Sequence, residues 1–308
     1  MLSDNLKSYL HLHLIVFIWG FTAVLGALIT LDALPLVWFR MLFAVGFIGI
    51  YIYFKKLSVR ITWKTFLQFV FSGLVIALHW FTFFKAIKVS NISITLACLS
   101  TGAFFASILE PILFRKKVVW YELLSGAIVI IGLYFVAASS TTGSEGLLES
   151  IVNGGNKFLF GIGLALISAF LSALFAVINS RLVQKHDATV ISFYELSGGV
   201  IFFSILLLAT QSFSTDFFML SPQNFMYLMV LSSVCTAYAF IASTSVMKFL
   251  SPYTVMLTIN LEPIYGIVLA VLVFEDKEKM SFEFYIGALI ILMTVILNAV
   301  IKSRKKLT

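Results

Sequence analysis

Charged side chains are rare within the long apolar segments of this chain, and those that occur there could do chemistry. Glu262 lies nine residues into the apolar segment 253–274, and Pro263 follows it. Proline removes a backbone donor and loosens the preceding turn, so a carboxyl beside it could bind a proton, a cation or a substrate amine. In the alternative interpretation, Glu262 is neutral or hydrogen-bonded and holds two helices together. A charge in an apolar medium is costly unless it is paired, so Glu262 needs a partner or a function.

Arg40 and Glu195 lie at similar depths in two other apolar segments, each about one and a half helical turns from a segment end. Arg40 could bind a substrate carboxylate through two guanidinium nitrogens, or it could brace neighbouring helices. His79 lies in the segment 66–87. A lone histidine in an apolar helix is usually a packing residue, yet histidine also changes charge near neutral pH. All three residues are candidates for substrate binding or coupling.

Glu110 precedes Pro111 and repeats the Leu-Glu-Pro of residues 261–263. It lies only five residues before Arg115, near the end of its apolar segment. Pairing with the basic stretch that begins at Arg115 is therefore the simpler interpretation of this carboxyl. We retain Glu110 as a candidate for binding or coupling.

Neutral polar residues also interrupt the apolar segments. Thr101 is part of a Ser-Thr-Gly interruption at 100–102, Tyr238 lies midway along the segment 224–247, and Asn260 precedes Glu262 by two positions. Small and hydroxyl-bearing residues let membrane helices approach and hydrogen-bond to one another, which is their default role. Residues two apart do not share a helix face, so at most one of Asn260 and Glu262 points squarely into a cavity.

These polar residues do not form an enzyme-like constellation. The acidic and histidine residues are dispersed over different depths, and the sequence has no Walker, Rossmann, His-Glu-x-x-His or Gly-x-Ser-x-Gly motif. Cys98 and Cys235 lie inside apolar segments at unrelated places and indicate neither a disulfide framework nor a metal site. We therefore expect no catalytic residue, no metal and no cofactor.

The segments that carry these residues belong to two copies of one unit. Residues 86–94 read Ala-Ile-Lys-Val-Ser-Asn-Ile-Ser-Ile, and residues 246–254 read Val-Met-Lys-Phe-Leu-Ser-Pro-Tyr-Thr, 160 positions later. The stretches 113–117 and 273–277, which follow the next apolar segment in each copy, are also 160 apart. A membrane protein built from two copies of a helical unit is usually a carrier, because two half-structures can rock about a central site.

Composition places the whole chain in a membrane. It is 308 residues long, 61% hydrophobic and 11% charged, whereas soluble domains carry about 25% charged residues. The apolar runs are long enough for helices that cross a hydrocarbon layer of about 30 Å. We predict an all-α membrane protein with ten transmembrane helices, at 11–31, 34–54, 66–87, 93–114, 120–139, 158–180, 190–210, 224–247, 253–274 and 282–301.

The longest gap between apolar segments divides the chain into two five-helix repeats, at 1–139 and 158–308. The linker 140–157 holds Thr-Thr-Gly-Ser-Glu-Gly and Asn-Gly-Gly-Asn, which are turn residues. Because five is an odd number, the second repeat enters the membrane in the opposite direction to the first. Inverted repeats of this kind place substrate sites near the midplane at the repeat interface.

Basic residues set the orientation of these helices. With the N-terminus in the cytoplasm, 15 of the 21 lysine and arginine residues fall on the inner side, as the positive-inside rule requires. Both termini are then cytoplasmic and the linker 140–157 is outside. The net charge of +7 does not indicate nucleic-acid binding, since insertion topology explains the basic residues.

The chain resembles the drug/metabolite transporter superfamily with two EamA-type domains, on the strength of the five-plus-five split and several short motifs. The motifs are Trp19-Gly20, Phe39-Arg40, the Phe-Lys-Ala-Ile-Lys at 84–88, the Leu-Glu-Pro at 261–263 and Glu275. The first copy departs from the family pattern, because the usual proline position falls near 102–103 and the acidic exit residue is replaced by Arg115. The resemblance implies export or uptake of small metabolites, often amino acids or related compounds.

We therefore expect a secondary transporter of the cytoplasmic membrane that works by alternating access. Its partners would be a small-molecule substrate, the lipid bilayer and, if transport is coupled, protons; a homodimer stays open. The third, fourth, eighth and ninth helices are the expected cavity walls. A non-transporting scaffold or sensor and an intramembrane enzyme are the alternatives.

Overall fold

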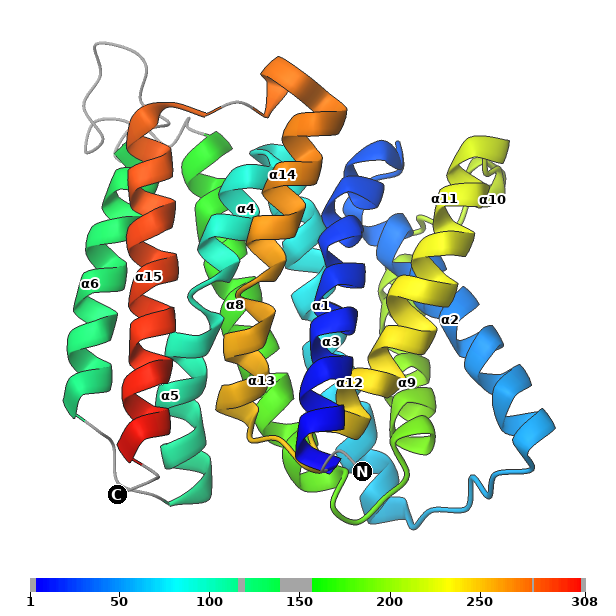
Figure 1. Cartoon of the computed structure of the whole chain (residues 1–308). Helices are drawn as coiled ribbons and strands as arrows, with labels where there is room; N and C mark the ends of the chain where they lie inside the picture. Colours follow the sequence, from blue (N-terminus) through cyan, green and yellow to red (C-terminus); the bar gives the residue numbers. More distant parts are fainter. Residues whose placement is uncertain (1–3, 116–119, 139–156, 279, 306–308) are drawn as a thin grey trace.

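A computed structural model describes residues 4–115, 120–138, 157–278 and 280–305, and every element in these ranges is helical (Figure 1). The helices of the first half are α1 (Asp4–Leu28), α2 (Ala33–Lys55), α3 (Trp63–Val89), α4 (Ile92–Leu99), α5 (Gly102–Phe114) and α6 (Trp120–Ala138). Those of the second half are α8 (Lys157–Leu182), α9 (Ala188–Ala209), α10 (Thr215–Phe218), α11 (Pro222–Ser232), the π-helical η1 (Ser233–Tyr238), α12 (Ala239–Val246), α13 (Pro252–Ile259), α14 (Glu262–Phe274), the 3₁₀ turn η2 (Glu275–Lys277) and α15 (Phe282–Lys305).

The prediction of an all-α membrane protein is confirmed. Within the described ranges, eight helical segments are long and apolar enough to cross a membrane. The predicted fifth and tenth spans correspond to α6 and α15, and the count of ten remains a prediction. Of the predicted linker 140–157, residues 140–156 lie outside the described ranges.

Side-chain caps explain where several of these helices begin. Thr62 accepts a hydrogen bond from the Thr65 amide at the start of α3, and Asn91 accepts one from the amide of Ile94 at the start of α4. Ser251 caps α13 in the same way, and Pro252 takes its first position. These residue types satisfy amides that a helix leaves without an internal partner.

Two of the predicted membrane spans are interrupted at equivalent places. Ser100 and Thr101 separate α4 from α5, and Asn260 and Leu261 separate α13 from α14. The interruptions are 160 positions apart, which is the spacing of the sequence repeat. Discontinuous helices in corresponding positions of two halves are typical of carrier binding sites.

The two halves run through the molecule in opposite directions. In Figure 1, α1 starts at the end marked N, α8 starts at the opposite end, and the C-terminus lies at the same end as the N-terminus. The halves interleave, because α3 packs against α8 and α9, α1 packs against α14, and α6 packs against α15. The interface between the halves therefore runs through the middle of the molecule.

Candidate functional site

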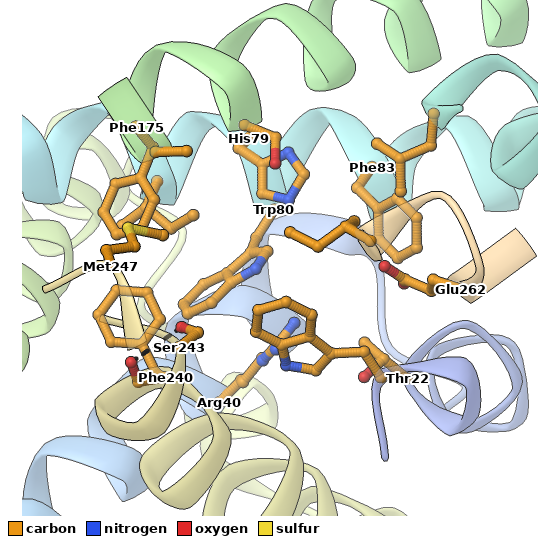
Figure 2. A pocket seen from close by; sticks show the side chains of 16 residues that line it. Thr22, Arg40, His79, Trp80, Phe83, Phe175, Phe240, Ser243, Met247 and Glu262 are labelled. Atoms are coloured by element: carbon orange, nitrogen blue, oxygen red, sulfur yellow. Dashed lines mark hydrogen bonds between the residues drawn. The ribbon is translucent and has the colours of Figure 1, made fainter. Parts of the chain in front are cut away.

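A pocket lies at this interface, and helices of both halves line it (Figure 2). The predicted third, fourth, eighth and ninth spans all contribute, through α3, α4, α12, α13 and α14. The first, second and sixth spans contribute as well, through α1, α2 and α8. The lining residues are Trp19, Thr22, Arg40, Ile76, His79, Trp80, Phe83, Leu99, Ser172, Phe175, Ala176, Phe240, Ser243, Met247, Ile259 and Glu262.

The wall of the pocket follows the internal repeat. Three pairs of lining residues are each 160 positions apart, namely Trp80 and Phe240, Phe83 and Ser243, and Leu99 and Ile259. The rings of the first pair contact each other, with centroids 5.6 Å apart. The pocket is therefore built from equivalent faces of the two halves, although its charged residues have no such counterparts.

Arg40 is held in this pocket by three neighbours. Its side chain is 1% exposed, so it faces the protein rather than lipid, as expected from the cost of a lipid-facing charge. Nε donates to Thr236 Oγ1 at 2.6 Å, and Nη2 donates to the Cys235 carbonyl at 3.5 Å. The guanidinium carbon lies 4.0 Å from the ring centroid of Trp80, within cation–π range. The third nitrogen, Nη1, has no hydrogen-bond partner among the described residues, so it is available to a ligand.

The acceptors of Arg40 come from the π-helical segment η1. Thr236 Oγ1 also donates to the Leu231 carbonyl, five residues earlier, at 2.7 Å. The Cys235 carbonyl accepts a second hydrogen bond, from Trp19 Nε1 at 3.2 Å. Single π turns are rare and often occur at functional sites. The sequence predicted one continuous helix over 224–247 and gave no signal of this widened turn.

Glu262 is the acidic residue of the pocket. It is 6% exposed and is the first residue of α14, where the positive end of the helix dipole favours a carboxylate. In the described part of the chain, the only ion pair closer than 4.0 Å joins Lys7 and Asp4. Arg40 and Glu262 therefore face the same pocket without neutralising each other by direct contact (Figure 2).

His79 completes the charged and titratable lining. Its Nδ1 lies 2.9 Å from the Ser168 carbonyl and 2.8 Å from Ser168 Oγ. A carbonyl can only accept, so this contact fits a hydrogen on Nδ1 and leaves Nε2 as the acceptor of a neutral ring. The seryl hydroxyl in turn donates to the His79 carbonyl at 3.1 Å. This bonding fixes the ring between α3 and α8.

Comparison with known proteins identifies the family. The model of the EamA-like transporter family matches residues 6–138 and 159–300. This chain belongs to the EamA-like transporter family. A protein of Archaeoglobus fulgidus described as an uncharacterized transporter is 23% identical over 306 residues, which cover 96% of this chain and 98% of that protein. A solved crystal structure shares the fold with a TM-score of 0.69 at 12% identity, covering 97% of this chain and 98% of the other.

Three other predicted site residues of this EamA-like chain lie outside the pocket. Thr101 Oγ1 donates to the Cys98 carbonyl at 2.8 Å, within the interruption between α4 and α5. Tyr238 is 43% exposed, and its hydroxyl lies 2.9 Å from His11 Nε2 in a separate surface groove. Asn260 lies two positions before Glu262 in the interruption between α13 and α14, where it is buried but does not line the pocket.

The remaining two carboxyls are buried elsewhere. Glu110 lies in α5 beside Pro111, and the lysines 116 and 117 of its expected basic neighbourhood lie outside the described residues. Glu195 is fully buried between α3, α8 and α9 and forms a hydrogen bond with Asn179. Among the described residues there is no group of three His, Cys, Asp or Glu side chains that could hold a metal ion.

The aromatic part of this EamA-family pocket was not predicted. Trp19, Trp80, Phe83, Phe175 and Phe240 line it, but the chain has 32 phenylalanines, most of which pack or face lipid. Composition therefore could not single out these rings. The repeat register could have helped, since Trp80 and Phe240 are aromatic at equivalent positions of the two copies.

Proposed function

We propose that this chain is a secondary transporter that moves a small metabolite across the cytoplasmic membrane by alternating access. The observation that carries the proposal is a pocket at the interface of two inverted halves, lined by one arginine and one glutamate that do not touch. Carriers built from inverted repeats bind their substrates at this interface. Membership of a transporter family supports the same conclusion.

The charges favour a substrate that carries both a carboxylate and an ammonium group, such as an amino acid or a related compound. Arg40, which lines the pocket, has one nitrogen without a hydrogen-bond partner among the described residues and uses the others to hold its position. A carboxylate would accept from that nitrogen, while Glu262 would accept from the ammonium group. The rings of Trp19, Trp80 and Phe240 would cover the apolar part of the substrate.

The geometry favours transport over the two alternatives. An intramembrane enzyme would need an acid, a base or a metal converging on one reacting atom, whereas His79 is bonded into the α3–α8 interface. A scaffold or sensor would not require opposite charges in an enclosed pocket, and a buried charge that serves no ligand is costly.

Substrate chemistry can be tested by ligand-induced thermal stabilisation of the purified protein, followed by counterflow in proteoliposomes. Ligands should be grouped as compounds with both charges, with the carboxylate alone and with the amine alone. We expect only the first group to stabilise strongly, because a ligand at 100 times its Kd adds about 2.7 kcal/mol. Equal stabilisation by carboxylates or amines alone would contradict the paired-charge site, and failure of every compound in counterflow would contradict transport.

Orientation in the membrane can be tested separately. We propose that both termini are cytoplasmic, because the basic residues cluster at the end of the bundle where the termini lie. Single cysteines at positions 58 and 146, in a background without Cys98 and Cys235, should react differently with an impermeant thiol reagent added to intact cells. We expect labelling at position 146 only. Labelling at position 58 but not at 146 would reverse the proposed topology.

A further inference from the structure

A second polar cluster lies outside the pocket, in the interior of the bundle. Glu195, Asn179 and Ser72 come from α9, α8 and α3, and all three are fully buried. Asn179 Nδ2 donates to Glu195 Oε1 at 2.8 Å and to Ser72 Oγ at 3.1 Å. The cluster thus joins one helix of the first half to two helices of the second half.

Two oxygen atoms of this cluster lack hydrogen-bond partners. Glu195 Oε2 and Asn179 Oδ1 are both buried, and neither has a partner in the part of the chain that the structure describes. A buried carboxylate with one bare oxygen and no cation is strongly disfavoured. Both oxygens are acceptors, and the one hydroxyl hydrogen of the cluster, on Ser72, can bond to Glu195, so Asn179 Oδ1 still lacks a donor.

The charged and titratable groups on the surrounding helices are engaged elsewhere or lie at the helix ends. His79 of α3 is bonded to Ser168, and Arg40 of α2 is bonded to Thr236. On α8, the Arg181 guanidinium donates to the Leu113 carbonyl, and on α9 the Tyr194 hydroxyl donates to the Val59 carbonyl. His186 and Asp187 precede α9, Lys55 ends α2, Lys64 lies in the first turn of α3, and α12 has no ionisable side chain. Within the described residues, Glu195 therefore has no cation closer than 4.0 Å.

We propose that Glu195 is a proton-binding site of the transporter, distinct from the substrate pocket. Uptake of one proton from water forms an O–H bond on Oε2 and changes the side chain from charge −1 to neutral. The new hydroxyl is the donor that Asn179 Oδ1 lacks, while the existing bond from Nδ2 to Oε1 is kept. The carboxylic acid and the amide then satisfy each other through both pairs of atoms.

The cluster is close enough to the pocket to exchange protons with it. Asn179 follows the pocket residues Phe175 and Ala176 by one helical turn on α8, and a turn rises about 5.4 Å. On α3, Ser72 precedes the pocket residue His79 by two turns, on the same face. A pocket that opens toward the inner side would therefore bring water within about a turn of Glu195.

The packing around Glu195 ties its protonation to the arrangement of the halves. The backbone of Glu195 contacts Gly73 of α3 so closely that a Cβ at Gly73 would collide with the Glu195 carbonyl. A shift between the halves would break the bond that Asn179 of the second half makes to Ser72 of the first, and by freeing the amide that pairs with Glu195 it would change the affinity for the proton. The position equivalent to Glu195 in the first copy is Pro35, so the cluster provides one proton site per chain. Coupling to substrate rests on the proposed transport function, but proton binding does not.

Infrared difference spectroscopy of the purified protein during acid–base titration tests proton binding without any transport. We expect a carbonyl band from a protonated carboxylic acid that is lost in Glu195→Gln and kept in the control Glu283→Gln, which removes an exposed carboxyl at the start of α15. Glutamine can make both bonds of the acid–amide pair, so the variant should fold. Asn179→Ser is the second variant, and it should keep the band but shift its frequency. A band unchanged in both variants would overturn the proposal.

Counterflow and gradient-driven uptake in proteoliposomes then test coupling. We expect Glu195→Gln to keep substrate exchange and to lose all stimulation of uptake by a pH gradient, whereas the control Glu283→Gln keeps both. Normal gradient stimulation in Glu195→Gln would overturn a coupling role for this site. If the wild-type protein itself shows no substrate exchange, the proposed transport function is contradicted instead. Failure of the coupling role and failure of the transport function therefore give different results.

Discussion

Replacing Arg40 with leucine should weaken substrate binding by about 10- to 100-fold. The guanidinium is the positive charge of the pocket, and its free Nη1 is the donor that a substrate carboxylate would reach. A hydrogen bond to a charged group is worth about 1.5–3 kcal/mol, which corresponds to a loss of about 10- to 100-fold in affinity. The variant also leaves Glu262 without an opposite charge in the pocket. Ligand-induced thermal stabilisation measures the affinity, and proteoliposome uptake measures the rate.

Two further variants keep this expectation testable. Arg60 is exposed in the connection between α2 and α3, so Arg60→Leu applies the same change outside the pocket and should bind substrate normally. Arg40→Lys keeps the charge but loses the planar fork that bonds Thr236 and Cys235, and we expect intermediate affinity. If Arg40→Leu folds and binds like the wild type, Arg40 only braces neighbouring helices. If it does not fold, the affinity of Arg40→Lys decides, since wild-type affinity there would show that the substrate does not depend on a hydrogen bond from Nη1 of the guanidinium.

The sequence was informative about the fold because the membrane constrains it strongly. Apolar length predicts spanning helices, and the 160-residue repeat predicts that the two halves share their irregularities. The interruptions at Ser100 and Asn260 follow from this repeat. Ionisable residues inside the apolar segments were also informative about the location of the candidate site. Three of them, Arg40, His79 and Glu262, line one pocket. An ionisable side chain in a membrane must find either a protein partner or a cavity.

The remaining features depend on how each helix is rotated, and a single sequence does not encode that rotation in an obvious way. Tyr238 and Thr101 belong to spans that line the pocket, but Tyr238 lines a separate groove and Thr101 hydrogen-bonds within the interruption between α4 and α5. The π turn at 233–238 is similar, because its partners Trp19 and Arg40 lie on other helices, far away in the sequence. The sequence alone did not identify Asn179 as a candidate for the same reason. Asn179 matters because its amide donates to Glu195, which lies on another helix.

The two buried carboxyls Glu262 and Glu195 have different surroundings, which suggests a division of roles in which one binds the substrate and the other binds the proton. Glu262 lines the pocket at the start of α14, opposite an arginine. Glu195 lies outside the pocket beside an amide and a hydroxyl, and the described residues offer it no cation within 4.0 Å. The first environment favours a carboxylate that binds a cationic group, and the second favours a carboxyl that holds a proton. Substrate and proton would then occupy neighbouring sites.

Glu262→Gln is the variant that separates these roles. Glutamine keeps the shape and most of the hydrogen-bonding capacity of glutamate, so the protein should fold. Its neutral amide cannot attract a substrate ammonium group, and we expect the affinity to fall by about 10- to 100-fold. Stimulation of the residual uptake by a pH gradient should be retained, because the proton would bind at Glu195. Uptake over a range of substrate concentrations, with and without a pH gradient, measures both quantities.

The matched control for this variant is Glu283→Gln, which removes an exposed carboxyl at the start of α15 and should leave both quantities unchanged. If uptake by Glu262→Gln no longer depends on the pH gradient, Glu262 carries the coupling proton. The assignment of substrate binding to Glu262 and proton binding to Glu195 is then wrong. If it transports normally with and without the gradient, Glu262 is structural, and the pocket does not recognise an ammonium group. Weaker affinity with intact coupling is the only result that fits a paired-charge substrate site beside a separate proton site.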